Sequence, residues 1–458
     1  MPAPTVVHYI RTSDGRRFIP NGLNLCFPRF ITDEAEGLAL YRRWIESLAA
    51  AGGNFLRLWL GHGFFDLEPA TCGVFSAERA ARLRTVLDYA QERNIKVKLT
   101  IDHFRSIVPE NVAESFPGSA SFDKPLYHPT QGGVARDMTD YLDSPAGRTH
   151  FCAKLDFLAA EFSQHPAIFA WELWNEMNAV KSDRWQAWTV FMLDELRARF
   201  PETLCLQSLG SFDCSGQQSN YEWYATLPQN DIVQVHRYID LAPGTFAACH
   251  GPVDIMAATA VRELRALAPE QPVILAESGA VEPGHRAPFE LYEKDVTGTI
   301  LHDVLFAAFF AGSAGPGQIW HWDLYVDRHN LWWHYRQFAA AIEGINPTEE
   351  SFVPHLQETP SLRAYELRGT TVSLYWLRDA HTDWRTELRD GYAPTVHKGC
   401  AFQPARYHSA QSWESLDPWE SAPKWKPLSK RGNSLHLPPW KRSILLRCLQ
   451  ISAASCPG

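Results

Sequence analysis

Short apolar segments alternate with amphipathic helical segments from about residue 18 to residue 345. Near-continuous apolar runs are typical of parallel strands that are buried on both faces. The clearest of the intervening helices is predicted over residues 76–94, with Ser76 as its N-cap. Eight candidate strands can be counted, over residues 18–25, 54–61, 96–102, 168–174, 203–209, 231–238, 272–279 and 317–322.

Eight strand-helix units favour an α/β fold of the closed (β/α)8 TIM-barrel type over an open doubly wound sheet. An open sheet usually carries a glycine-rich GxGxxG turn after its first strand, and the sequence contains none. After Pro347 the pattern changes to short alternating strands with Pro, Trp and polar turns. We therefore predict a catalytic barrel over residues 1–348 and a small β-sandwich accessory domain over residues 349–458.

The composition excludes several classes of partner. A chain of 458 residues is long enough for two domains, and its net charge of -9 gives no basic face for nucleic acid. The N-terminus lacks a signal-peptide pattern, and the most apolar later stretch, residues 304–315, is too short to span a bilayer. We expect no membrane association and a cytoplasmic location, unless a leader has been removed. The oligomeric state is left open.

The cysteine content indicates no particular site, whereas the aromatic content is compatible with carbohydrate binding. Nine cysteines without a CxxC pair signal neither a disulfide framework nor a zinc site. The 17 tryptophans suit a carbohydrate site, because sugar rings stack on aromatic faces, although cores also use tryptophan.

Two long connections follow predicted strand ends, over residues 103–147 and 279–298. In a barrel they lie on the C-terminal face, where active sites are built. Loops of this length are uncommon unless they are functional. Within the first, residues 122–129 either close over a substrate or cover the barrel rim.

Two glutamates stand at predicted strand ends. Asn175 and Glu176 end the fourth strand, and Glu277 ends the seventh. Retaining hydrolysis of a glycosidic bond needs two carboxyl groups about 5–5.5 Å apart, one as acid/base and one as nucleophile. A single strand-end glutamate is usually just solvated, but the paired placement predicts Glu176 as the acid/base and Glu277 as the nucleophile.

These residues resemble the clan-A glycoside hydrolases, most closely family 5 with its mannanase- and cellulase-like members. That family carries Asn-Glu after strand four and a nucleophilic Glu after strand seven. The acid/base is followed here by Met177-Asn178, where the family often has Pro, and the nucleophile lies in Ala-Glu-Ser-Gly, where Gly-Glu-Phe-Gly is frequent. The resemblance implies substrate-binding roles for Arg57, His103, Asn175, His236, Tyr238, Trp320 and, as its neighbour, Trp322.

Each role has a chemical reason. Arg57 is expected to hold Glu277 ionised, while a proton donor such as Glu176 needs a raised pKa at neutral pH. Tyr238 can donate to the second oxygen of Glu277, and Asn175 can bond the sugar 2-hydroxyl. The alternatives are structural: an ion-pair partner for Arg57, polar rim positions for the histidines and core packing for Trp320.

No metal or cofactor is expected. His321, His329 and His334 lie near Asp323 and Asp327 in the sequence, but their spacing fits no known zinc-ligand pattern. The residues after the eighth strand are interpreted as a loop that lines a subsite.

The predicted function is hydrolysis of a β-linked oligo- or polysaccharide by double displacement, with mannosides or mannans as the first expectation. A β-glucosidase or cellulase and a β-galactosidase are the alternatives within the clan, and transglycosylation would use the same residues. From other classes, a non-catalytic carbohydrate-binding barrel remains open. An aldolase or phosphate-binding lyase is disfavoured, because no strand ends in a suitable lysine. Endo or exo action is undecided.

Overall fold

The computed structural model describes residues 5–12, 15–111, 120–347, 349–405 and 411–450. The helices are α1 (Glu34–Ala50), α2 (Ala77–Glu92), α3 (Met138–Asp143), α4 (Pro145–Phe162), α5 (Trp185–Arg199), α6 (Gln218–Tyr224), α7 (Val253–Leu267), α8 (Thr299–Phe310) and α9 (Trp333–Ala341). None of these helices is both long and apolar enough to cross a membrane.

The strands of the N-terminal part are β1 (Ile10–Arg11), β2 (Arg17–Phe18), β3 (Gly22–Asn24), β4 (Phe55–Trp59), β5 (Lys96–Asp102), β6 (Ile168–Trp174), β7 (Leu204–Leu206), β8 (Val233–Ile239) and β9 (Val273–Ala280). The C-terminal strands are β10 (Val353–Glu358), β11 (Leu362–Arg368), β12 (Val372–Asp379), β13 (Ala401–Phe402), β14 (Gln411–Leu416), β15 (Lys426–Pro427), β16 (Ser429–Arg431), β17 (Ser434–His436) and β18 (Ser443–Gln450).

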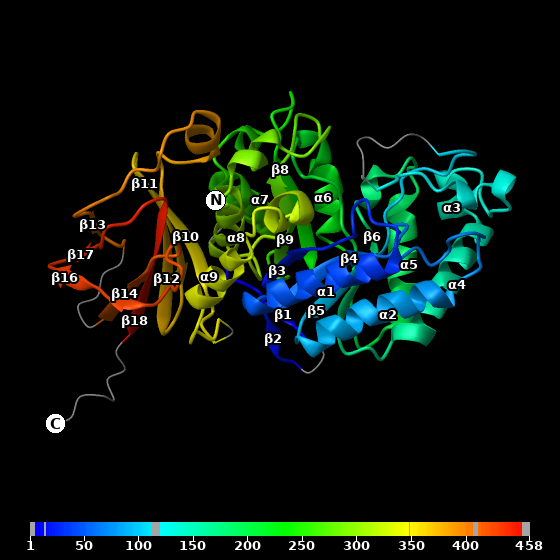
Figure 1. Ribbon diagram of the computed structural model, residues 1–458, viewed down its shortest axis with the longest axis horizontal. Coiled ribbons are helices and arrows are strands. Elements are labelled where there is room, and N and C mark those ends of the chain that lie inside the picture. The colour runs from blue at the N-terminus through cyan, green and yellow to red at the C-terminus, as the bar shows by residue number, and fades with distance from the viewer. Residues whose placement is uncertain (1–4, 13–14, 112–119, 348, 406–410, 451–458) are drawn as a thin grey trace.

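The parallel strands lie at the centre of this part of the chain, with helices packed around them (Figure 1). Strands β3 to β7 pair in chain order, and β8 pairs with β9. The two sheets are linked where Asp231 N–H donates to the Cys205 carbonyl at 3.1 Å. On the other side, Ile319 bridges Ser278 of β9, and its carbonyl accepts from Asn24 N–H of β3. The predicted barrel is therefore present.

The eighth strand is shorter than the predicted run of residues 317–322. Among the described residues it amounts to the single bridge at Ile319. The chain turns immediately afterwards, because Trp322 N–H donates to the carbonyl of Trp320 at 2.9 Å, and residues Trp322–Asp327 coil into a π-helix. This turn replaces an extended strand, and the Trp320 and Trp322 rings lie edge to face with their centroids 5.2 Å apart.

The helices follow the predicted pattern closely. Helix α2 begins after Ser76, whose side chain accepts from Arg79 N–H at 3.2 Å, so the N-cap prediction is confirmed. Leu83, Val86 and Leu87 are fully buried on its inner face. The short helices α3 and α6 were not predicted. Helix α3 lies within the long loop after β5, and α6, which connects β7 and β8, is only 7 residues long.

The barrel interior contains a charged layer that apolar patterning did not predict. Arg57, Lys98 and Glu172 are almost completely inaccessible to solvent, and all lie within strands. Lys98 Nζ lies 3.0 Å from a Glu172 oxygen, and Arg57 bonds the other oxygen of the same carboxylate. Buried charges persist only when they are paired and hydrogen-bonded, as these are.

The C-terminal part consists of two antiparallel sheets. A six-stranded sheet has the order β10-β11-β12-β18-β14-β15, and a three-stranded sheet has the order β13-β17-β16. An apolar cluster that includes Tyr375, Phe402, Trp413 and Trp440 gathers residues of both sheets. The predicted boundary at residue 348 lies outside the described residues.

Buried ion pairs join the six-stranded sheet to the barrel helices. Arg378 of β12 forms two hydrogen bonds with Asp303 of α8, at 2.8 and 3.0 Å, and neither side chain is more than 1% exposed. Arg363 of β11 binds Asp254 of α7 in the same two-pronged way. These pairs fix the orientation of the sheet against the barrel, beside the apolar contact of Trp376 with Phe306.

Replacing Arg378 by Ala should destabilise the protein strongly. The change leaves the Asp303 carboxylate buried without its partner, and breaking such a pair costs about 3–5 kcal/mol of folding free energy. Urea denaturation measures the loss. The control is Arg389→Ala, which removes an exposed pair with Asp390 and should change stability little. Equal stability of the two variants would contradict a structural role for the buried pair.

Candidate active site

The two predicted carboxylates meet at the C-terminal mouth of the barrel. Glu176 follows β6 and Glu277 lies near the end of β9, and one oxygen of each lies within 4.8 Å of the other. Both line a pocket of about 540 Å³. That volume is in the range of roughly 300–1,000 Å³ that is usual for ligand sites.

Glu277 is held by two hydrogen-bond donors, and a histidine lies close to it. Arg57 Nη1 donates to one carboxylate oxygen, and the Tyr238 hydroxyl donates to the other at 2.8 Å. His236 Nδ1 lies 3.5 Å from that second oxygen. Burial and the neighbouring Glu277 charge raise the pKa of Tyr238 well above its usual value, so its hydroxyl remains a donor. These contacts fix the orientation of the Glu277 carboxylate beside a positive charge.

Arg57 also organises the far side of the site. Its Nη2 donates to Glu172 and, at 2.8 Å, to the side-chain oxygen of Asn175. Burial alone would lower the pKa of Arg57, but the charges of Glu172 and Glu277 raise it above its usual value. The arginine is therefore always charged, and it fixes Asn175 next to Glu277.

Glu176 is placed by an unusual backbone conformation. Its φ of 56° lies in the left-handed region, which non-glycine residues rarely adopt. The backbone N–H of Glu176 donates to Ser208 Oγ at 3.1 Å, and the N–H of Met177 donates to the Ser208 carbonyl. Strained residues of this kind are frequent at functional sites, where the surroundings hold them in place.

The carboxylate of Glu176 contacts one histidine and one arginine. His236 Nδ1 lies 3.0 Å from one oxygen, and Arg105 Nη2 donates to the other at 2.5 Å. Burial raises the pKa of Glu176, but the His236 hydrogen bond and the Arg105 charge outweigh it and lower the pKa to about 2. The predicted raised pKa is therefore contradicted, because sequence patterning did not reveal Arg105 as a partner.

The remaining predicted residues occupy three different settings. Trp320 is half-buried, lines the pocket and lies 4.9 Å from the Trp59 ring. Trp322 is fully buried behind it and does not line the pocket. His103 stacks on Trp59 at 4.7 Å and lines a neighbouring pocket instead.

Two arginines that line the pocket, Arg105 and Arg29, were not predicted from the sequence. Phe122 lies in the segment 122–129, for which closure over a substrate was one of the two predictions. Arg105 and Phe122 form a cation–π pair at 4.1 Å beside Glu176. Arg29 lines the opposite side and is held by Asp323 at 2.6 Å. A charged residue within an apolar strand, such as Glu172, is a signal that could have revealed the network around Arg57.

Potential metal ligands gather in three places among the described residues. The sets are Glu176, His236 and Glu277; Glu68, Cys72 and His150; and Asp213, Asp240 and His285. The first set is the carboxylate pair with its bridging histidine. None of the three includes His321, His329 or His334.

The fold resembles that of solved glycoside hydrolases. A structure described as a glycoside hydrolase has a TM-score of 0.63 and 12% identity, with 98% of this chain and 97% of the other covered. A family 5 glycoside hydrolase from Bacteroides vulgatus has a TM-score of 0.59 and 13% identity, with 98% of this chain and 94% of the other covered. The endo-β-1,4-mannanase from Thermotoga petrophila has a TM-score of 0.52 and 14% identity, with 95% of this chain and 98% of the other covered.

No protein-family model matches the chain, and no curated protein matches it significantly. The structural similarity nevertheless covers nearly the whole chain. The protein therefore has the fold of the clan-A glycoside hydrolases, of the family 5 type.

Replacing Arg105 by Met should raise the pKa of Glu176, because the change removes a positive charge that stabilises the carboxylate. Carbon-13 NMR titration of glutamate carboxyl groups, with Glu176→Gln to assign the signal, measures the shift. The control is Arg286→Met, on the loop that borders the pocket. In the described part of the chain, the Arg286 side chain donates a hydrogen bond to the Pro283 carbonyl and to no carboxylate. An unchanged Glu176 pKa in the Arg105 variant would show that this ion pair does not form in solution.

Proposed function

We propose that the protein is a retaining β-glycosidase that acts by double displacement. The observation that carries the proposal is the approach of a Glu176 oxygen to within 4.8 Å of a Glu277 oxygen. Retaining enzymes hold their carboxyl groups about 5–5.5 Å apart, whereas inverting enzymes need about 6.5–9.5 Å to admit a water. The short separation favours direct attack on the sugar.

The environments of the two glutamates assign their roles. Glu277, fixed by Arg57 and Tyr238, attacks the anomeric carbon while the bond to the leaving oxygen breaks, and Glu176 gives that oxygen a proton. Water then attacks the same carbon, transfers its proton to Glu176 and releases Glu277. Asn175, held by Arg57, is placed to bond the sugar 2-hydroxyl.

Glu176 must gain a proton before it can serve as the acid. Its pKa of about 2 reflects the bonds from Arg105 and His236. We infer that the substrate's leaving group displaces Arg105, whose side chain is 30% exposed and packs over the Phe122 ring. Losing that positive neighbour raises the pKa of Glu176 and favours the protonated form.

The substrate we favour is a β-mannoside or a β-mannan. This choice rests on the likeness to the Thermotoga petrophila endo-β-1,4-mannanase. Trp320 offers an aromatic face for a pyranose ring, and we assign no sugar contact to the buried Trp59 and Trp322. β-Glucosides and β-galactosides are the alternatives. We also propose that the two C-terminal sheets form an accessory β-sandwich, separated from the barrel near residue 348.

Replacing each glutamate should have a distinct effect on hydrolysis. Glu277→Ala removes the nucleophile and should abolish activity on every β-glycoside. Glu176→Ala should retain activity on aryl glycosides with good leaving groups, because these need no proton, and should lose it on oligosaccharides. Rates on aryl β-mannoside, β-glucoside and β-galactoside, measured beside β-1,4-mannotetraose, check both effects and identify the sugar.

The control is Glu290→Gln, at an exposed position on the loop that follows β9. It should behave as wild type. Wild-type activity in both glutamate variants would contradict the assignment. Sugar binding by the wild type without any turnover would instead favour a carbohydrate-binding barrel.

A further inference from the structure

The charged layer inside the barrel centres on Glu172, which has no part in the proposed reaction. This residue lies on β6, four positions before Glu176, and its side chain is inaccessible to solvent. It is not among the described residues that line the catalytic pocket. An apolar layer would stabilise the barrel at least as well, because taking charges out of water is costly. The charges at this level of the barrel therefore call for a role other than stability.

One oxygen of Glu172, Oε1, receives two hydrogen bonds that lead toward the catalytic pocket. Arg57 Nη2 donates to it from β4, and the Ser208 hydroxyl donates to it at 2.8 Å from the segment after β7. The same guanidinium donates to Glu277 through Nη1, and to Asn175 through Nη2. Because a guanidinium is planar and rigid, the position of Nη2 against Glu172 sets the direction in which Nη1 reaches Glu277.

Ser208 connects Glu172 to the other glutamate of the site. Its Oγ accepts from the backbone N–H of Glu176 at 3.1 Å. A hydroxyl has one hydrogen to give, and the Trp174 carbonyl lies 3.3 Å from the same Oγ. The Glu172 oxygen is nearer and charged, so it is the better acceptor. The left-handed backbone of Glu176 is therefore held by a hydroxyl that Glu172 orients.

The second oxygen of Glu172 is held from the opposite side. Lys98 Nζ lies 3.0 Å from it and Gln234 Nε2 lies 3.2 Å from it, and Lys98 also donates to Gln234 Oε1. Burial lowers the pKa of Lys98 to about 8, so the ammonium predominates at pH 7. Burial raises the pKa of Glu172, but the charges of Arg57 and Lys98 outweigh it and hold that pKa well below its usual value. Glu172 is thus an anion whose two oxygens both have fixed partners.

From these contacts we propose that Glu172 is a positioning residue for both glutamates of the site. Through Arg57 it orients the proposed nucleophile, through Ser208 it fixes the backbone of the proposed acid/base, and Lys98 supplies the charge that holds it in place. The proposal rests on the proposed glycosidase function, and it accounts for two carboxylates from different strands being held within 4.8 Å. Glu172 itself touches no substrate and transfers no proton.

Removing the charges of Glu172 and Lys98 together tests the proposal. Either single change leaves one buried charge unpaired, whereas Lys98→Met combined with Glu172→Gln removes both charges and keeps side chains of similar size. The melting temperature of the double variant should stay close to that of the wild type. Its kcat on the best aryl β-glycoside should fall about tenfold or more with KM changed less than about threefold, because small displacements of reacting groups cost up to about 10²-fold in rate.

Ser208→Ala tests the connection to Glu176 separately and introduces no unpaired charge. The change removes the hydroxyl that bonds Glu172 and accepts from the Glu176 N–H. A misplaced acid/base matters most for a leaving group that needs a proton. The rate on β-1,4-mannotetraose should therefore fall about tenfold or more, and the rate on an aryl glycoside with a good leaving group less than about threefold. A purely structural role for Ser208 would not separate the two substrates.

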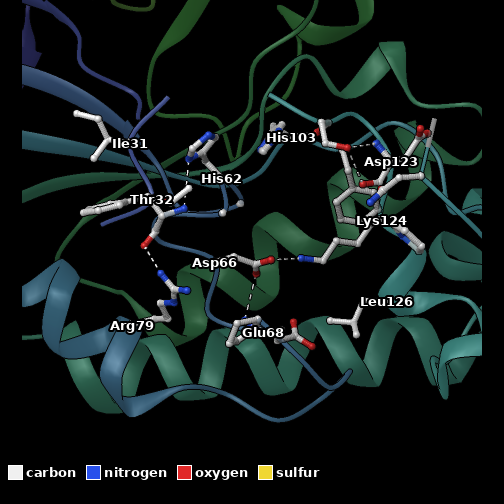
Figure 2. Close-up of a pocket in the computed structure, with 18 residues that line it drawn as sticks. Ile31, Thr32, His62, Asp66, Glu68, Arg79, His103, Asp123, Lys124 and Leu126 are labelled. Carbon is white, nitrogen blue, oxygen red and sulfur yellow. Dashed lines mark hydrogen bonds and ion pairs between the residues drawn. The ribbon is translucent and has the colours of Figure 1, made fainter. Parts of the chain in front are cut away.

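The control for the double variant is an ion pair of the same type in the neighbouring pocket that His103 lines. Figure 2 shows Asp66 and Lys124 pointing toward one another there, with Lys124 Nζ 2.5 Å from the carboxylate. In the part of the chain that the structure describes, neither side chain bonds Glu172 or Arg57. Lys124→Met combined with Asp66→Asn should therefore keep the wild-type kcat on the aryl glycoside.

The control for Ser208→Ala is Ser313→Ala. Ser313 is also fully buried, but its hydroxyl donates to the carbonyl of Val273, at the start of β9 and thus at the far end of the barrel from the site. This variant should show no difference between the two substrates.

The outcomes separate the positioning role from the glycosidase function. Wild-type kcat in a folded double variant would overturn the positioning role and leave the glycosidase function intact. Equal losses on both substrates in Ser208→Ala would overturn the connection from Glu172 to Glu176, whether or not the double variant folds. A wild type that hydrolyses no glycoside would remove the glycosidase function and, with it, any positioning role in catalysis.

Discussion

The buried guanidinium of Arg57 is the interaction on which the site depends. It bonds Glu277 on one side and Glu172 on the other, so one cation links the proposed nucleophile to the interior of the barrel. Lys98 supplies a second positive charge beside Glu172, and the four groups are balanced. Removing any one of them would leave an uncompensated charge where water cannot reach. The site is consequently rigid at its base.

The outer half of the site is less tightly held. His236 lies between the two glutamates, and Arg105 reaches Glu176 from the loop that follows β5. Arg57 has no exposed side-chain surface, whereas the side chain of Arg105 is 30% exposed. A nucleophile gains from a fixed environment, but an acid/base must exchange its proton and needs a neighbour that can move. The difference in burial fits that division of roles.

The sequence allowed the barrel and the positions of Glu176 and Glu277 to be predicted, because a strand end is defined by local patterning. It did not reveal Arg105 as a partner of Glu176, since that contact depends on the path of a long loop. Trp322 was expected beside the substrate as the neighbour of Trp320. The chain turns after Trp320, and Trp322 is fully buried. Local rules failed where tertiary contacts replaced regular structure.

Covalent trapping with a 2-deoxy-2-fluoro β-glycoside of the preferred sugar tests the role of Glu277 most directly. The fluorine slows both displacements, and a good leaving group offsets this effect in the first step only, so the glycosyl-enzyme should accumulate. Mass spectrometry of the intact protein should show the addition of one sugar, and peptide mapping should place it on Glu277. A label on another residue, or an unlabelled enzyme whose product has the inverted anomeric configuration, would contradict double displacement at Glu277.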